Sequence, residues 1–227
     1  MPGMAARTPG GLTTYSKSLF GNRPEIRPRH KTALSASYSS TMVKRCLIII
    51  IDLLNEYLDL WDADRADRLV QNTNRLVGVF RRLQLPVIWV RQEFRSDLSD
   101  AFLEMRDKRI AVTIQGTRGA QLHAGLDWQP RDATIIKKRY SAFFKTGLDE
   151  LLAELGIDEL VLCGVNTHAC IRVAAVDAYQ RDFRVVLAEE CVGSYDAEHA
   201  RVSLDYMDGK IAKIATVSEI VEALGVI

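Results

Sequence analysis

The sequence predicts an α/β fold: a single doubly wound domain whose mostly parallel six-stranded sheet carries helices on both faces. Three observations lead to this prediction. Short apolar runs rich in β-branched residues recur after residue 42, and they are near-continuous rather than alternating, which is typical of strands covered on both faces. Amphipathic helical patterns lie between most of these runs. The repeated order of strand, helix and strand favours parallel pairing through right-handed crossovers.

The first predicted strand, residues 46–51, is the longest apolar run of the chain. It is far too short to cross a bilayer, and its β-branched content is typical of a buried strand. Five further runs of the same character complete the predicted sheet. They are residues 86–90, 133–136, 160–163, 184–188 and 211–216.

Two helices are predicted from stripes of apolar residues at helical spacing. One stripe comprises Leu69, Thr73, Leu76, Val77, Phe80 and Leu83, and the other comprises Leu148, Leu151, Leu152 and Leu155. The second stripe ends at Gly156, a residue type that helix C-termini favour. Further helices are expected over about residues 169–181 and 196–206. The sequence contains no internal repeat and no sign of a second domain.

Composition and charge exclude several classes of partner. The chain has 227 residues, of which 48% are hydrophobic and 26% charged, which is enough for one well-buried core. The 30 Lys and Arg against 29 Asp and Glu give a formal net charge of +1, so no overall field attracts nucleic acid or an anionic membrane. No nucleic acid and no membrane are therefore expected as partners, and electrostatics alone names no other partner.

Residues 1–42 are predicted to be a disordered basic extension, and residues 43–227 to form the domain. Residues 1–45 contain eight Lys or Arg and a single acid, Glu25, with no sustained apolar period, so this segment cannot bury enough surface to fold. It is an organelle transit peptide, a plain tail, or an extension upstream of a start at Met42. The composition favours an extension without function and leaves the other interpretations open.

The four cysteines form no CxxC pair, which favours reduced thiols in the cytoplasm over a disulfide framework. Cys46 and Cys163 lie inside predicted strands and are expected to be buried. Cys191 is expected to be either inert or a bystander to oxidation. Cys170 differs, because it falls in the predicted first turn of a helix, where backbone N–H groups and the helix dipole lower a thiol pKa and can bind an oxyanion.

Two more charged residues follow predicted strands, and reactive groups of doubly wound sheets gather at such strand ends. Asp52 directly follows the first strand. It either caps the turn or helix over residues 53–58, which is the favoured interpretation for an isolated Asp, or acts as a general base. Lys137 follows the third strand and opens a run of three cations. Such a run is usually a solvated loop, but Lys137 could also point inward and stabilise carboxylate and thiolate charge.

Three motifs carry a family resemblance: Asp52 at a strand end, Lys-x-Arg-Tyr-Ser-x-Phe at residues 137–143, and Gly-Val-x-Thr-x-x-Cys at residues 164–170. Together and in this order they resemble the isochorismatase-like cysteine hydrolases. The similarity extends from about Val43 to the C-terminus and includes a glycine-containing loop at residues 116–122. One such motif alone is a weak signal, whereas three in order are specific.

The resemblance implies a catalytic triad of Asp52, Lys137 and Cys170. Cys170 would attack a carbonyl and form an acyl-enzyme, Asp52 would take the thiol proton and pass it to the leaving amine, and Lys137, rather than Lys138, would hold the charged pair. The resemblance also implies a cis peptide bond between Val165 and Asn166. This bond would aim the Asn166 N–H, together with that of Cys170, at the oxyanion.

The cysteine also bears on the type of reaction. Isochorismatases proper hydrolyse a vinyl ether without a cysteine, whereas amidase members of the family keep the thiol, so Cys170 favours cleavage of a C–N bond in a small amide or carbamoyl compound, such as an N-carbamoyl amino acid. A vinyl-ether hydrolase and a catalytically silent binding scaffold stay open as alternatives. Nicotinamidases carry a metal site after the second strand, but residues 91–97 contain no histidine here, so no metal and no cofactor are expected.

Substrate contacts are the least specified part of the prediction. Arg118 or Arg91 could pair with a substrate carboxylate, and both are equally plausible as solvated arginines. Tyr57, Trp89 and Phe143 could supply apolar walls, although Trp89 lies within a predicted strand and could be core. His168 is expected to line the pocket or the surface. A homo-oligomer, either a dimer or a tetramer, is implied by the resemblance, with the amphipathic segments 195–207 and 217–224 as candidate interfaces.

Overall fold

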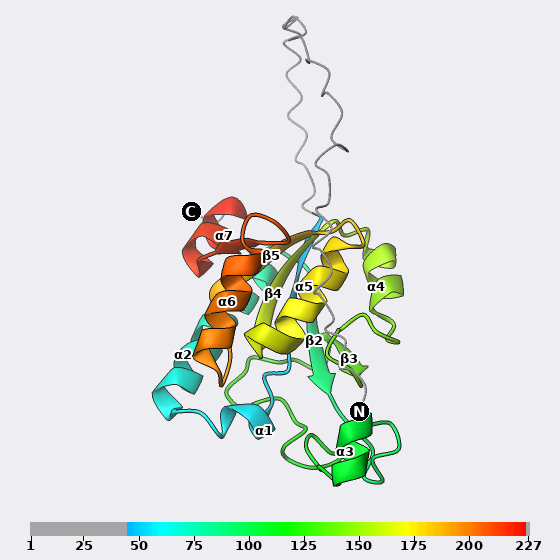
Figure 1. Cartoon of the computed structure of the whole chain (residues 1–227). Coiled ribbons are helices and arrows are strands. Elements are labelled where there is room, and N and C mark those ends of the chain that lie inside the picture. Colours follow the sequence, from blue (N-terminus) through cyan, green and yellow to red (C-terminus); the bar gives the residue numbers. More distant parts are fainter. Residues whose placement is uncertain (1–44, 226–227) are drawn as a thin grey trace, which may run out of the picture. The chain divides into compact units, whose positions relative to one another are not determined.

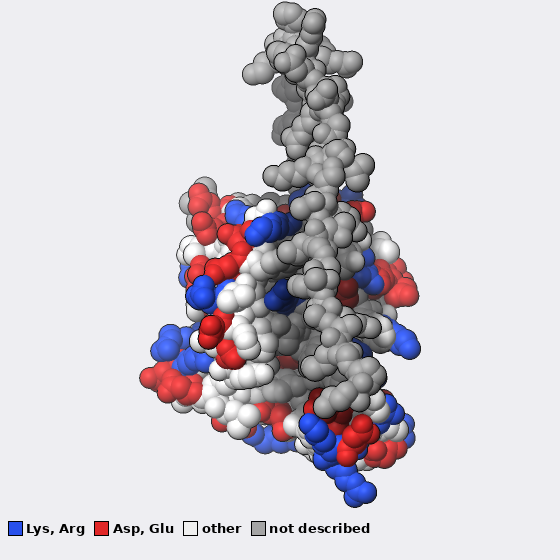
Figure 2. Space-filling model, viewed as in Figure 1, with Lys and Arg blue, Asp and Glu red and all other residues white. Residues whose placement is uncertain are grey.

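The computed structural model of the chain describes residues 45–225 (Figure 1). The predicted basic extension, residues 1–42, lies outside the described residues. Within residues 45–225 the chain forms a six-stranded parallel sheet with helices on both faces, as the sequence predicts. On the face seen in Figure 2, positive and negative side chains are interspersed over the described surface.

The sheet has the strand order β3-β2-β1-β4-β5-β6, and every pair is parallel. The chain leaves the central strand β1 in one direction through β2 and β3, and returns to its other side through β4, β5 and β6. The order therefore reverses between β1 and β4, and ligands of such sheets bind beyond the strand ends at this point. The strands are β1 (Cys46–Ile51), β2 (Val87–Gln92), β3 (Ala133–Lys137), β4 (Glu159–Val165), β5 (Arg184–Gly193) and β6 (Lys213–Ala215).

The helices follow the predicted stripes, with differences at their ends. Helix α2 (Ala63–Arg82) begins before its apolar stripe, because Asp62 caps it by accepting a hydrogen bond from the Arg65 N–H at 3.1 Å. Helix α3 (Leu103–Lys108) was not predicted, and none of its residues is buried. The others are α1 (Asn55–Leu58), α4 (Leu148–Leu155), α5 (Arg172–Tyr179), α6 (Ala197–Met207) and α7 (Val217–Ala223).

Two apolar clusters flank the sheet because successive side chains of a strand point to opposite faces. In β1, where every residue is buried, Ile48 and Ile50 join the cluster under α2 and α7, whereas Ile49 and Ile51 join the cluster under α4, α5 and α6. Within residues 45–225, no helix combines the length and apolar character needed to cross a membrane. The predicted oligomer stays a prediction; α6 exposes Val202 to solvent.

Gly164 allows β4 to lie unusually close to β1 at the end that precedes Asp52. Its φ of +126° lies in the region that favours glycine, and a Cβ at this position would come within 1.9 Å of the Ile51 carbonyl oxygen. The β4–β5 pairing also shifts register between Leu162 and Gly164. Only glycine therefore fits where the central strands deliver Asp52 and the segment that leads to Cys170.

Gly164→Ala is expected to lower the free energy of unfolding by roughly 3 kcal/mol or more, because it adds both backbone strain and overlap with β1. Urea denaturation followed by circular dichroism measures this loss. Gly147→Ala is the matched control, since Gly147 has a φ of −86° and a Cβ there would have no neighbour within 4 Å. Equal stability of the two variants would contradict the close approach of β4 to β1.

Candidate active site

The structure brings Asp52, Lys137 and Cys170 together at the reversal point of the sheet. The Lys137 Nζ atom lies 2.6 Å from Asp52 Oδ2 and 3.3 Å from Cys170 Sγ. The Asp52 and Lys137 side chains are fully buried, and Cys170 is 6% exposed. Three residues from separate parts of the sequence thus form one buried cluster of a carboxylate, an ammonium and a thiol.

Asp52 is held by the neighbouring strand β2. Its backbone N–H donates to the Val90 carbonyl at 2.9 Å, and its Oδ1 accepts from the Gln92 backbone N–H at 2.7 Å. Its φ of +58° is left-handed, a conformation that Asp tolerates better than most residues. Leu54 occupies the N-cap position of α1, so the interpretation of Asp52 as a helix cap is wrong. The cap of a short helix depends on the residue at which the helix begins, and the sequence pattern did not specify that residue for α1.

Lys137 is the last residue of β3, and its ammonium also donates to the Arg139 carbonyl at 3.1 Å. Lys138 instead pairs with Asp100 at 2.9 Å, away from the cluster. Burial lowers the pKa of Lys137, but the Asp52 charge and the hydrogen bonds to Asp52 and Cys170 outweigh burial and leave its pKa raised. Lys137 is therefore a cation in the buried cluster.

The prediction that a helix N-terminus lowers the pKa of Cys170 is wrong. Burial and the Asp52 charge raise its pKa to about 12, although the Lys137 ammonium acts in the opposite direction. Cys170 also lies not in the first turn of an α-helix but in a π-helical turn, Thr167–Ile171, that precedes α5. The resting thiol is therefore protonated at neutral pH.

The Val165–Asn166 peptide bond is cis, as the family resemblance implies. The Asn166 carbonyl accepts from the Ala169 N–H at 3.0 Å and from the Ile171 N–H at 3.2 Å, so it anchors the turn that contains Cys170. The Asn166 side chain accepts from the Tyr195 N–H at 3.4 Å. The end of β4 and the turn after it thus form one hydrogen-bonded unit.

Gln92 is a site residue that the sequence interpretation missed. Its backbone holds Asp52, and its side-chain Oε1 accepts from the Tyr57 hydroxyl at 2.8 Å. Burial, followed by the Asp52 charge, raises the pKa of Tyr57, so this phenol is protonated. Gln92 Nε2 and Thr167 Oγ1 are buried and have no hydrogen-bond partner within residues 45–225. Gln92 lies just after the second predicted strand, and this position is the signal from which the sequence analysis could have identified it.

Of the four predicted substrate contacts, only Tyr57 lies beside the cluster. The Arg118 side chain is 69% exposed and pairs with Asp59. Trp89 is fully buried in the core, where its indole N–H donates to Asp132 at 2.9 Å. The structure therefore does not bring Arg118 or Trp89 into the site.

Phe143, the fourth predicted contact, packs under the Arg181 guanidinium, whose Cζ is 4.6 Å from the ring centroid. Arg181 follows the C-terminal end of α5, whereas Cys170 precedes its N-terminal end. Phe143 therefore packs at the end of α5 away from Cys170 and has a structural role.

Arg91, the other arginine considered, contacts Glu93 at 3.6 Å. His168 Nδ1 lies 2.6 Å from Ser194 Oγ, so this ring is turned toward β5 and its following loop. Residues 45–225 contain no group of three His, Cys, Asp or Glu that could hold a metal ion.

Comparisons with known proteins agree with this architecture. A family model described as the isochorismatase domain matches residues 46–219. YecD, an uncharacterized isochorismatase family protein of Escherichia coli O157:H7, is 30% identical over 80% of this chain and 97% of its own. The crystal structure of an isochorismatase family protein from Desulfovibrio vulgaris has a TM-score of 0.73 at 25% identity, covering 80% of this chain and 99% of that one.

An enzyme with a stated activity is also similar. N-carbamoylsarcosine amidase from Thermoplasma acidophilum has a TM-score of 0.66 at 26% identity, covering 76% of this chain and 96% of that one. The family match spans most of the described residues, and the YecD match spans nearly all of that relative. This chain belongs to the isochorismatase family of hydrolases.

Proposed function

We propose that this protein is a cysteine hydrolase that cleaves a C–N bond of a small amide or carbamoyl compound through an acyl-enzyme on Cys170. The observation that carries the proposal is the buried cluster in which Lys137 Nζ lies 3.3 Å from the thiol and 2.6 Å from the Asp52 carboxylate. A nucleophile and a base oriented by a third charged group are the parts that covalent acyl transfer needs.

The reaction begins with attack of Cys170 Sγ on the substrate carbonyl. As the S–C bond forms, the thiol proton moves to Asp52, which then gives it to the leaving nitrogen while the C–N bond breaks. Water next attacks the thioester and loses a proton to Asp52. The C–S bond breaks, and the proton returns to sulfur, which restores the resting enzyme.

Two further groups stabilise charge during these steps. Lys137 stays a cation throughout and offsets the negative charge that moves between Asp52 and the sulfur. The backbone N–H groups of Asn166 and Cys170 bind the carbonyl oxygen of the tetrahedral intermediate.

The polar groups beside the cluster support a substrate with more than one hydrogen-bond acceptor. Tyr57 donates to Gln92 Oε1, and the buried Gln92 Nε2 is a donor without a hydrogen-bond partner among the residues that the structure describes. A buried donor without a partner is costly, so a ligand acceptor would stabilise it. N-carbamoyl amino acids carry a ureido carbonyl and a carboxylate, and N-carbamoylsarcosine amidase is a structural relative.

Cys170→Ala is expected to reduce ammonia release by at least about 1000-fold, because the nucleophile is lost. The substrates are N-carbamoylsarcosine, other N-carbamoyl amino acids and small primary amides. Cys46→Ala is the control, since this buried cysteine lies at the opposite end of β1. Isochorismate hydrolysis that survives Cys170→Ala would favour the vinyl-ether alternative, and a wild-type protein that turns over none of these compounds would favour a binding scaffold.

Asp52→Asn is expected to change turnover and thiol alkylation in opposite directions. Turnover falls by at least about 100-fold because the base is lost. The Asp52 charge raises the pKa of Cys170, so its removal lowers that pKa and increases the thiolate fraction at pH 8. Iodoacetamide should then label the Cys170 peptide faster than in the wild type, as measured by mass spectrometry.

The control for this prediction is Asp59→Asn, which removes a partly exposed carboxylate that pairs with Arg118. It should change neither rate. Slower labelling of Cys170 in Asp52→Asn would mean that Asp52 promotes the thiolate in the resting enzyme and would contradict the assignment of a neutral thiol.

A further inference from the structure

The distance between Lys137 and Cys170 depends on two segments that are far apart in the sequence. Lys137 ends β3 and leads into residues 138–147, whereas Cys170 lies in the turn that leads into α5. Lys137 Nζ and Cys170 Sγ are 3.3 Å apart, and a shift of either segment would change that distance. Contacts between residues 138–149 and α5 therefore bear directly on the geometry of the site.

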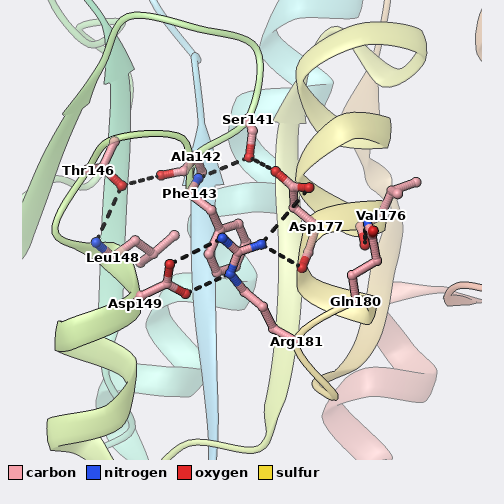
Figure 3. Close-up of polar contacts among 10 residues, drawn as sticks. All are labelled: Ser141, Ala142, Phe143, Thr146, Leu148, Asp149, Val176, Asp177, Gln180 and Arg181. Atoms are coloured by element: carbon pink, nitrogen blue, oxygen red, sulfur yellow. Dashed lines mark hydrogen bonds and ion pairs between the residues drawn. The ribbon is translucent and has the colours of Figure 1, made fainter.

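Ser141 makes the central contact between these segments (Figure 3). Its hydroxyl donates to Asp177 Oδ2 at 2.5 Å and accepts from the Phe143 N–H at 3.1 Å. The residue is 4% exposed. The hydroxyl has a single proton and gives it to Asp177. This bond therefore determines how the loop after β3 contacts α5.

Asp177 lies on α5, seven residues after Cys170, and both residues contact the segment that begins at Lys137. Ser141 in turn follows Lys137 by four residues. The two segments thus meet at Lys137 with Cys170 and again at Ser141 with Asp177.

A third contact lies one helical turn further on, where Arg181 binds Asp149 with its Nε at 2.7 Å and a terminal nitrogen at 3.2 Å (Figure 3). Arg181 also donates to the Asp177 carbonyl at 3.1 Å. The Arg181 and Asp149 side chains are 35% and 46% exposed, and exposed ion pairs contribute little. The buried Ser141 hydroxyl is therefore the stronger candidate for holding the two segments in register.

We infer that Ser141 and Asp177 are positioning residues that keep Lys137 within reach of Cys170, an inference that rests on the proposed function. Neither residue needs to touch the substrate. Their hydrogen bond limits how far the loop after β3 can move from α5, and rates of attack depend steeply on such displacements.

The test measures acylation of Cys170 by p-nitrophenyl acetate. In this step the sulfur attacks the acetyl carbonyl, the thiol proton goes to Asp52, the C–O bond breaks, and p-nitrophenolate leaves. The amplitude of the p-nitrophenolate burst counts competent thiols, and its rate constant reports their positioning. A loss of folded protein lowers the amplitude, whereas a misplaced Lys137 lowers the rate constant.

Ser141→Ala and Asp177→Ala are each expected to lower the burst rate constant roughly tenfold or more with little change in amplitude. The double variant should be no slower than the slower single variant, because both remove the same bond. Asp177→Asn keeps an acceptor oxygen and should stay within about threefold of the wild type. Asp177 makes an ion pair with Arg181, four residues away, at 4.0 Å. Asp205→Ala on α6 is the control, since Asp205 makes the same kind of helical ion pair with Arg201 at 2.8 Å.

Unchanged rate constants, a loss confined to the amplitude, or an Asp177→Asn protein as slow as Asp177→Ala would overturn the positioning role alone. A burst that survives Cys170→Ala, or a wild-type protein without a burst, would overturn the assignment of the nucleophile and this inference with it.

Discussion

The buried ion pair between Lys137 and Asp52 is the interaction on which the site depends. Either charge alone would be costly at a position with no solvent exposure, and the contact at 2.6 Å offsets that cost. The pair has no net charge, so an ionised Cys170 beside it would add an uncompensated charge. Burial and the Asp52 charge therefore outweigh the Lys137 ammonium and raise the pKa of the thiol.

The sheet delivers these groups because its strand order reverses at the site. β1 and β4 lie side by side, and Gly164 lets them approach closely at the end where Asp52 and the Cys170 turn begin. Lys137 comes from β3, two strands away from β1, and its long side chain spans the end of β2. A shorter cation at that strand end would not reach the carboxylate.

Gln92 connects the buried cluster of Asp52, Lys137 and Cys170 to its surroundings. Its backbone N–H holds the Asp52 carboxylate, and its side chain takes the Tyr57 hydroxyl. One residue at the end of β2 therefore orients the proposed base and also presents a buried donor beside it. Buried polar groups of this kind discriminate among ligands, because a ligand without a matching acceptor leaves the donor unpaired.

The sequence by itself determined the architecture, and the family resemblance of its motifs indicated the three groups of the buried cluster. Runs of β-branched residues predicted each strand, because buried parallel strands need apolar side chains on both faces. Motif spacing selected Lys137 over Lys138, and the structure pairs Lys138 with Asp100 instead. Helix α3 was missed because none of its residues is buried, so it leaves no apolar stripe.

Tertiary structure alone decided the environment of those groups. Asp52 and Lys137 lie 118 and 33 residues from Cys170 in the sequence, yet burial and their charges determine the pKa of the thiol. The result is a raised pKa, opposite to the lowering that the local helical turn predicts. Trp89 and Arg118 could have faced the site or turned away from it, since residue type does not specify what a side chain meets in space. The sequence thus specified which chemical groups are present, and the packing of distant segments decided their ionisation and their neighbours, because electrostatic energy and burial depend on distances through space.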